Sequence, residues 1–317
     1  MPESFDFREL HGIIPPVCTP FADGQVAIDD LRNLLTFQLE SGVHGLFMLG
    51  STSETVSLTD AQQEQVISTA LDVAKGKVPI IAGSIDFTAQ RVIERAKRAE
   101  ALGVDGHVVI APFYLKPSGD EIVRHYTMIR EAVDKPIIAY DIPGAVQTKL
   151  DRASIRKLVE GGVIAGLKDS SGQDANFRGV VLDNADHPEF RIFTGSELTV
   201  DSALSWGAHG CVPGLGNVDP AGYVKLYTSF REGRMADVKT EQERLYRLFS
   251  IARVAAPREG IGHSAGAWGS FKQALGIRGI IEHDQPVPPL SPLTEEERAG
   301  IREILVATGL VPDVIAL

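Results

Sequence analysis

Cysteine is scarce in this chain of 317 residues: only Cys18 and Cys211 occur, and no CxxC pair or Cys/His cluster accompanies them. A disulfide framework or a cysteine-based zinc site needs more cysteines at closer spacing, so we expect neither. The 8 histidines are scattered and no pair has the HExxH spacing, so we expect no metal site. Two unpaired cysteines are typical of a reducing compartment, which predicts a cytoplasmic protein.

Basic residues are also few, with 31 Lys and Arg against 42 Asp and Glu and a formal net charge of −11. The acidic residues are spread along the chain, a distribution that makes nucleic acid or an anionic membrane an improbable partner. No apolar run is long enough to span a membrane. The segment Met1–Leu10 lacks the basic start and apolar run of a signal peptide. We therefore expect neither a nucleic-acid nor a membrane partner.

Short apolar runs rich in β-branched residues recur along the chain, with amphipathic segments between them. Each run is almost continuously apolar, as expected for parallel strands that are covered on both faces. The runs are Ile13–Val17, Gly45–Leu49, Val78–Ala82, Gly106–Ile110, Pro136–Tyr140, Val163–Leu167, Phe190–Phe193 and His209–Val212. Eight strands that alternate with helices predict an α/β protein with a parallel sheet.

The intervening segments have helical periodicity and helix start signals. Leucines at 31, 34, 35 and 39 fall on one face, and this spacing predicts an amphipathic helix that packs on the sheet. Three pairs have capping-box spacing: Thr59 with Gln62, Ser118 with Glu121, and Thr294 with Glu297. After about residue 230 only helical patterns remain, over Ala236–Ala255, Gly269–Leu275 and Glu295–Thr308. The run Pro286–Leu290 predicts an extended connector.

A closed (β/α)8 TIM barrel and an open doubly wound sheet both accommodate this alternation. A nucleotide-binding open sheet needs a glycine-rich loop after its first strand, whereas here Pro15 and Pro16 stand at that place and no GxGxxG follows. We therefore predict a barrel over residues 1–230 and a C-terminal helical domain over residues 231–317.

Polar residues at the ends of the predicted strands are the candidates for chemistry, because barrel active sites lie at the carboxyl ends of the strands. Lys168 ends the sixth run and would project into the barrel mouth. Desolvation there favours the neutral amine, which can attack a carbonyl carbon. A structural ion pair with Asp169 is an equally good interpretation.

Tyr140 ends the fifth run, where it could act as a general acid and base or simply close the barrel rim. Ser51 and Thr52 follow the second run, and their hydroxyls and backbone amides are suited to binding a carboxylate. Tyr114 by itself is expected to be an interface or core aromatic residue. Ser264 resembles a nucleophile elbow only loosely, because no apolar strand precedes it.

In this order and spacing, these motifs resemble the dihydrodipicolinate synthase and N-acetylneuraminate lyase family of Schiff-base aldolases. The resemblance extends from Pro16–Phe21 to Pro288–Leu293. It implies a TIM barrel, commonly a homotetramer, in which Lys168 forms the imine and Tyr140 transfers protons. It also implies that Ser51 and Thr52 hold the carboxylate of a 2-oxo acid, and that Tyr114 completes a hydroxyl relay across a subunit interface. No cofactor is implied beyond the covalent imine.

The sequence departs from the family pattern where the rest of the substrate would bind. Dihydrodipicolinate synthases have an arginine two residues after their Tyr-x-x-Pro motif, where this chain has Gly144 and Ala145 after Pro143. Ser53 replaces a glycine that the family usually has in the carboxylate-binding turn. Glu197 lies in a loop that in neuraminate lyases contacts sugar hydroxyls, but Gly214 replaces a serine of those enzymes. Val212, at the end of the eighth run, completes the expected substrate contacts.

These departures favour a lyase that acts on a 4-hydroxy-2-oxo acid or a 2-keto-3-deoxy sugar acid by aldol cleavage, condensation or dehydration. Two alternatives stay open. One is dihydrodipicolinate synthase, which is now called 4-hydroxy-tetrahydrodipicolinate synthase. The other is a barrel that binds 2-oxo acids without catalysis.

Overall fold

The chain folds as a (β/α)8 barrel with additional C-terminal helices, and the computed structural model describes residues 5–256 and 258–313. We expect no signal peptide in Met1–Leu10, and residues 1–4 of that segment lie outside the described residues. So do Pro257 and residues 314–317 of the expected helical domain. Within the described residues, no helix is both long enough and apolar enough to cross a membrane.

One sheet of parallel strands forms the centre of the molecule, in the order β1-β10-β9-β8-β7-β6-β5-β4. Its strands are β1 (Gly12–Ile13), β4 (Leu46–Met48), β5 (Ile80–Gly83), β6 (Gly106–Ile110), β7 (Ile137–Asp141), β8 (Gly166–Asp169), β9 (Arg191–Thr194) and β10 (Gly210–Cys211). A parallel bridge between Pro16 and Phe47 joins the two edges, and the Val17 amide donates to the Phe47 carbonyl at 2.9 Å. The predicted barrel is therefore confirmed.

The first strand is shorter than the predicted Ile13–Val17. Pro15 and Pro16 have no N–H to donate to a ladder, so the regular pairing of β1 ends at Ile13 and only the bridge at Pro16 continues it. A small antiparallel hairpin, β2 (Phe21–Ala22) with β3 (Gln25–Val26), follows and was not predicted.

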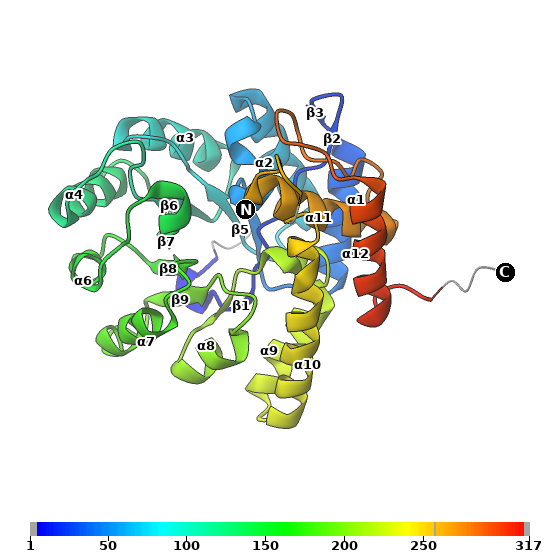
Figure 1. The fold of residues 1–317 in the computed structure, drawn as a ribbon. Helices are drawn as coiled ribbons and strands as arrows, with labels where there is room; N and C mark the ends of the chain where they lie inside the picture. Colours follow the sequence, from blue (N-terminus) through cyan, green and yellow to red (C-terminus); the bar gives the residue numbers. More distant parts are fainter. Residues whose placement is uncertain (1–4, 257, 314–317) are drawn as a thin grey trace.

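Helices surround the strands, as Figure 1 shows, and α9 to α12 gather on one side next to α1. The α-helices are α1 (Ile28–Glu40), α2 (Asp60–Ala74), α3 (Ala89–Leu102), α4 (Gly119–Arg130), α5 (Pro143–Val146), α6 (Arg152–Glu160), α7 (Asp174–Asp183), α8 (Val200–Trp206), α9 (Pro220–Arg231), α10 (Met235–Leu248), α11 (His263–Ile277) and α12 (Glu295–Ala307). Short 3₁₀ turns are η1 (Phe7–Glu9), η2 (Ser51–Ser53), η3 (Thr55–Ser57), η4 (Gly214–Asn217) and η5 (Phe249–Arg253).

The local start signals are confirmed. Thr59, Ser118 and Thr294 each accept the backbone amide three residues on, while the Gln or Glu at that position bonds back to the cap. The C-terminal prediction was less accurate. The helix predicted over Ala236–Ala255 ends at Leu248 and continues as the 3₁₀ turn η5, and the Pro286–Leu290 connector contains a turn closed by the Leu290 amide on the Val287 carbonyl.

Candidate active site

Two neighbouring strands place Lys168 and Tyr140 side by side at the carboxyl end of the barrel. The strands β7 and β8 are paired so that Tyr140 lies opposite Lys168. The Lys168 Nζ lies 4.0 Å from the centroid of the Tyr140 ring and 4.9 Å from that of Phe47. Lys168 is only 5% exposed and Tyr140 4%. The amine is thus held between two aromatic faces and shielded from bulk water.

The alternative interpretation of Lys168, an ion pair with Asp169, is wrong. The Asp169 carboxylate lies 3.8 Å from the Nζ of Lys149, which also pairs with Asp141. Both aspartates are buried, and burial raises the pKa of Asp141 although its bond to Lys149 opposes the shift. Lys149 therefore neutralises the carboxylates at the ends of the two strands, and Lys168 has no carboxylate within ion-pair distance among the described residues.

A cavity of about 550 Å³ opens beside this pair of residues. Residues from several strand ends and from α11 line it: Ser51, Thr52, Thr55, Val56, Ile85, Ile110, Phe113, Tyr140, Ile142, Gly144, Ala145, Val146, His263, Ser264, Ala267 and Trp268. Its volume is that of a site for a small organic molecule. Four predicted site residues, Ser51, Thr52, Tyr140 and Ala145, meet in this cavity, whereas Lys168 contacts the Tyr140 ring but is not among the lining residues.

The side chain of Ser53 anchors the turn that carries Ser51 and Thr52. The Ser53 hydroxyl donates to the Val17 carbonyl at 2.5 Å and accepts the Gly50 amide at 3.2 Å. Ser53 is fully buried and does not line the cavity. The serine in place of the usual glycine thus adds a hydrogen bond between strand ends and does not narrow the cavity.

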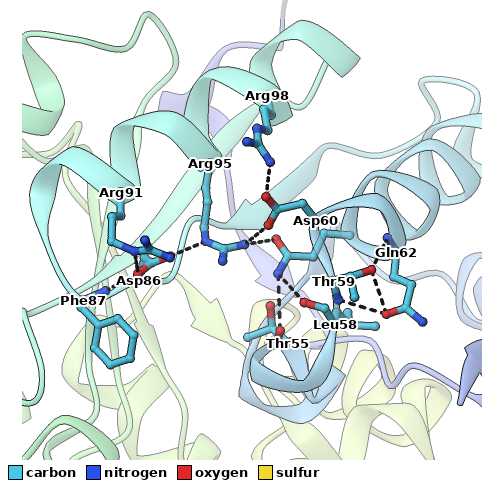
Figure 2. Close-up of polar contacts among 11 residues, drawn as sticks. Thr55, Leu58, Thr59, Asp60, Gln62, Asp86, Phe87, Arg91, Arg95 and Arg98 are labelled. Atoms are coloured by element: carbon cyan, nitrogen blue, oxygen red, sulfur yellow. Dashed lines mark hydrogen bonds and ion pairs between the residues drawn. The ribbon is translucent and has the colours of Figure 1, made fainter.

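A polar network shown in Figure 2 holds the next turn, η3, against α2 and α3. The Gln63 amide donates to the carbonyls of Thr55 and Leu58, and the Arg95 guanidinium donates to Gln63 at 2.7 Å. Arg95 also bridges Asp60 and Asp86. Thr55 lines the cavity, so this network helps to set the cavity wall.

Glu197, Val212 and Gly214, which were predicted as substrate-binding residues, lie outside the cavity lining. The Glu197 carboxylate accepts the Gly214 amide at 2.8 Å. Burial raises the pKa of Glu197, and the positive charge of Lys168 opposes that shift. Val212 is buried directly after β10, with its amide donating to the Thr194 carbonyl at 2.8 Å. One Glu197 oxygen is therefore engaged by the backbone of Gly214.

Tyr114 is separate from this group. It is 94% exposed, has φ of 69°, and does not line the cavity. Its ring meets the Phe87 ring edge-on at 6.4 Å, and Phe87 in turn lies against Phe113 at 4.5 Å. The Tyr114 hydroxyl faces solvent and not the site of its own chain.

The contribution of α11 to the cavity was missed from the sequence. The prediction began this helix at Gly269, whereas it begins at His263 and places His263, Ser264 and Trp268 on the cavity wall. Gly262 offers no side chain to cap the helix, so the usual start signal is absent. The apolar spacing of Ala265 and Trp268 was the remaining clue.

The geometry defines a (β/α)8 barrel whose cavity, lined mostly by apolar side chains with a few polar ones, lies at the carboxyl ends of its strands. No group of three or more His, Cys, Asp or Glu side chains within residues 5–256 and 258–313 is arranged to hold a metal ion.

Comparison with known proteins is consistent with this architecture. The model of the dihydrodipicolinate synthetase family matches residues 9–308, and the chain belongs to that family, whose members are lyases. An uncharacterized DapA-like lyase of Halobacterium salinarum is 32% identical over 311 residues, covering 98% of both chains. A 4-hydroxy-tetrahydrodipicolinate synthase of Anaeromyxobacter dehalogenans is 29% identical over 303 residues, covering 96% of this chain and 99% of that protein.

Solved structures agree. Escherichia coli YagE, a prophage protein of the dihydrodipicolinic acid synthase family crystallised with pyruvate, superposes with a TM-score of 0.89 at 27% identity. The superposition covers 96% of this chain and 100% of the YagE chain. The dihydrodipicolinate synthase of Thermotoga maritima gives 0.87 at 25% identity, with coverages of 95% and 99%. The resemblance noted in the sequence is therefore confirmed.

Proposed function

We propose that this protein is a class I lyase that forms an imine between Lys168 and pyruvate or a longer 2-oxo acid. Its substrate is a 4-hydroxy-2-oxo acid or a 2-keto-3-deoxy sugar acid. The observation that carries the proposal is the register of β7 and β8, which places the Nζ of Lys168 4.0 Å from the centroid of the Tyr140 ring. Lys168 is buried and is not paired with a carboxylate, and the Tyr140 side chain lines a cavity large enough for a small organic molecule. No cofactor beyond the covalent imine is needed.

In this mechanism the Lys168 amine attacks the ketone carbon, and loss of water gives the imine. The protonated imine withdraws electrons from the carbon–carbon or carbon–oxygen bond that forms or breaks. Tyr140 is the group that gives and takes the proton at each step, because its ring is adjacent to the amine and its side chain lines the cavity. Ser51 and Thr52 hold the carboxylate of the 2-oxo acid through hydroxyls and the amides of η2.

The absence of cationic side chains from the cavity lining supports an aldehyde substrate that has no carboxylate of its own. The lining residues include no lysine or arginine; Tyr140 and His263 are the titratable ones. Gly144 and Ala145 occupy the place after Pro143, so this loop presents no cation. Glu197 lies outside this lining, and we propose that its carboxylate accepts substrate hydroxyls once the substrate is bound. A neutral hydroxyaldehyde fits this surface better than a charged semialdehyde does.

We further propose that the enzyme is a cytoplasmic homo-oligomer, a tetramer or a dimer, in which Tyr114 serves the site of a neighbouring copy. The side chains of Tyr114, Leu115 and Phe87 are large, apolar and 94%, 59% and 46% exposed. Tyr114→Phe should reduce turnover in the oligomer, and it should leave the molar mass measured by light scattering unchanged.

Reduction with borohydride in the presence of pyruvate tests the main proposal. Mass spectrometry should find a stable adduct on Lys168, and Lys168→Ala should abolish it. Lys239→Ala, a change at a lysine with 79% side-chain exposure on α10, is the matched control and should leave trapping intact. An unmodified Lys168 at saturating pyruvate, with the protein shown to be folded, would contradict the proposal.

The names of relatives such as the Anaeromyxobacter protein favour a second candidate, 4-hydroxy-tetrahydrodipicolinate synthase. A coupled assay with pyruvate and aspartate semialdehyde decides between the two. Robust turnover there, with none on 4-hydroxy-2-oxo acids, would select the synthase. If pyruvate is trapped but neither aspartate semialdehyde nor any 4-hydroxy-2-oxo acid is turned over, the protein is instead a barrel that binds 2-oxo acids without catalysis.

A further inference from the structure

The opposite face of the barrel, where the strands begin, carries a second and larger cavity of about 850 Å³. Amino-terminal faces of barrels usually contribute to stability and not to ligand binding. This one is lined by the start of the chain, by residues at the beginnings of strands and by the end of α9. The residues that matter for its chemistry are His11, His44, Arg191, His209, Tyr227 and Arg231.

Two arginines of this lining have no ion-pair or hydrogen-bond partner among the described residues. Arg191, at the start of β9, has its Nε buried and unbonded, and burial lowers its pKa. Arg231 ends α9 and is exposed. The other lining arginine, Arg8, is instead paired with Asp6. Arg191 lines the cavity without a carboxylate in ion-pair distance among the described residues, and such a guanidinium is suited to bind an oxyanion.

Two histidines add neutral donors to the same cavity. The Ile13 amide donates to Nδ1 of His44 at 3.2 Å, and the Ile192 amide donates to Nδ1 of His209 at 3.1 Å. Because Nδ1 accepts in both rings, each neutral ring carries its proton on Nε2, at the edge turned away from the backbone. Burial lowers the pKa of both His44 and His209 to about 4, so these N–H donors persist at neutral pH.

The His44 ring is held in place by its surroundings. Gly12 has φ of +80°, and a Cβ there would lie 2.4 Å from the ring. The Tyr227 and His11 rings lie 5.1 and 5.2 Å from it, edge-on.

The carboxylates of the lining, Glu9 and Glu232, are exposed, and Glu232 pairs with Arg234 outside the lining. The inner part of the cavity therefore presents donors and positive charge.

We propose that this cavity is a binding site for a small organic or inorganic anion bearing carboxylate or phosphate groups, held by Arg191 and Arg231 with the Nε2–H groups of His44 and His209. The site is independent of the chemistry at Lys168. Arg191 lies opposite Gly166, so the site is at the start of β8 while Lys168 is near the carboxyl end of that strand.

Isothermal titration calorimetry with citrate and, separately, with inorganic pyrophosphate tests the proposal at constant ionic strength. Saturable binding of citrate alone identifies carboxylate groups, and of pyrophosphate alone phosphate groups. Arg191→Gln should weaken binding by about thirtyfold or more, as loss of a partly buried charge partner does. Arg231→Gln, at an exposed position, should weaken it by about two- to fivefold.

Two controls locate the site. Arg247→Gln makes the same change at an exposed residue near the far end of α10 and should bind like the unmodified protein, as should Lys168→Ala. Nitrogen NMR of the imidazoles should show His44 and His209 protonated at Nε2, with shifts that move on addition of the anion. Absence of saturable binding of both probes overturns the proposal, as does undiminished binding in both arginine variants or its loss in Lys168→Ala.

Discussion

Replacement of Lys272 by methionine is expected to destabilise the protein strongly, because it leaves a charge buried without a counter-ion. Lys272 of α11 and Glu54, which directly follows η2, form an ion pair in which both side chains are 0% exposed. The Lys272 Nζ also lies 3.3 Å from the Gln285 carbonyl and 4.6 Å from the Phe21 ring centroid. Burial lowers the pKa of Lys272, and the Glu54 carboxylate opposes this.

The size of the effect follows from what remains after the substitution. Glu54 would keep one hydrogen bond, from the Val287 amide at 2.9 Å, and no cation. Removing one partner of a buried pair costs about 3–5 kcal/mol. For a chain of this size that corresponds to an apparent Tm lowered by roughly 5–8 °C. Methionine has a similar volume, so lost packing contributes little.

Thermal and urea unfolding of single and double variants separate charge from packing. The double variant Lys272→Met/Glu54→Gln should recover most of the lost stability, because the glutamine oxygen still accepts the Val287 amide and carries no charge. Lys239→Met breaks the exposed pair with Glu243, whose closest N···O distance is 3.9 Å, and should cost less than about 1 kcal/mol. A double variant as unstable as Lys272→Met would refute the reasoning.

Three further outcomes are expected. Tyr140→Phe should lower turnover by roughly 10²–10⁴ while leaving a slowly formed adduct that borohydride can trap; near-normal turnover would remove Tyr140 from the proton relay. Trp268→Ala should enlarge the cavity wall and raise KM more than it lowers kcat, measured with the best 2-oxo acid substrate, and an unchanged KM would show that the substrate does not reach α11. Burial lowers the pKa of His125 to about 4 from 6.5, so the unfolded chain binds more protons between these values. Stability of roughly 3 kcal/mol is then lost as the pH falls from 6.5 to 4, and urea unfolding of His125→Gln should show less of this loss.

The sequence indicates the parts of this protein that depend on neighbours along the chain. Apolar β-branched runs predict the strands because a strand covered on both faces has no place for polar side chains. Capping pairs such as Ser118 with Glu121 predict helix starts because the bonds involved span three residues. Lys168 and Tyr140 could be chosen because each ends such a run, and successive parallel strands of a barrel bring their ends together.

Only the tertiary structure decided which side chains meet across the barrel. Lys149, and not Lys168, neutralises Asp169, because the pairing of β7 with β8 brings the segment after β7 beside the end of β8. Helix α11 forms a wall of the cavity and pairs Lys272 with Glu54, and no periodicity reports a contact between such distant segments. The cavity around Arg191 likewise combines strand starts with the end of α9. Local sequence patterns specify helices and strands because the interactions that form them are short-range. Which side chains from distant segments meet is determined by the packing of the closed barrel, and side-chain spacing alone does not encode it.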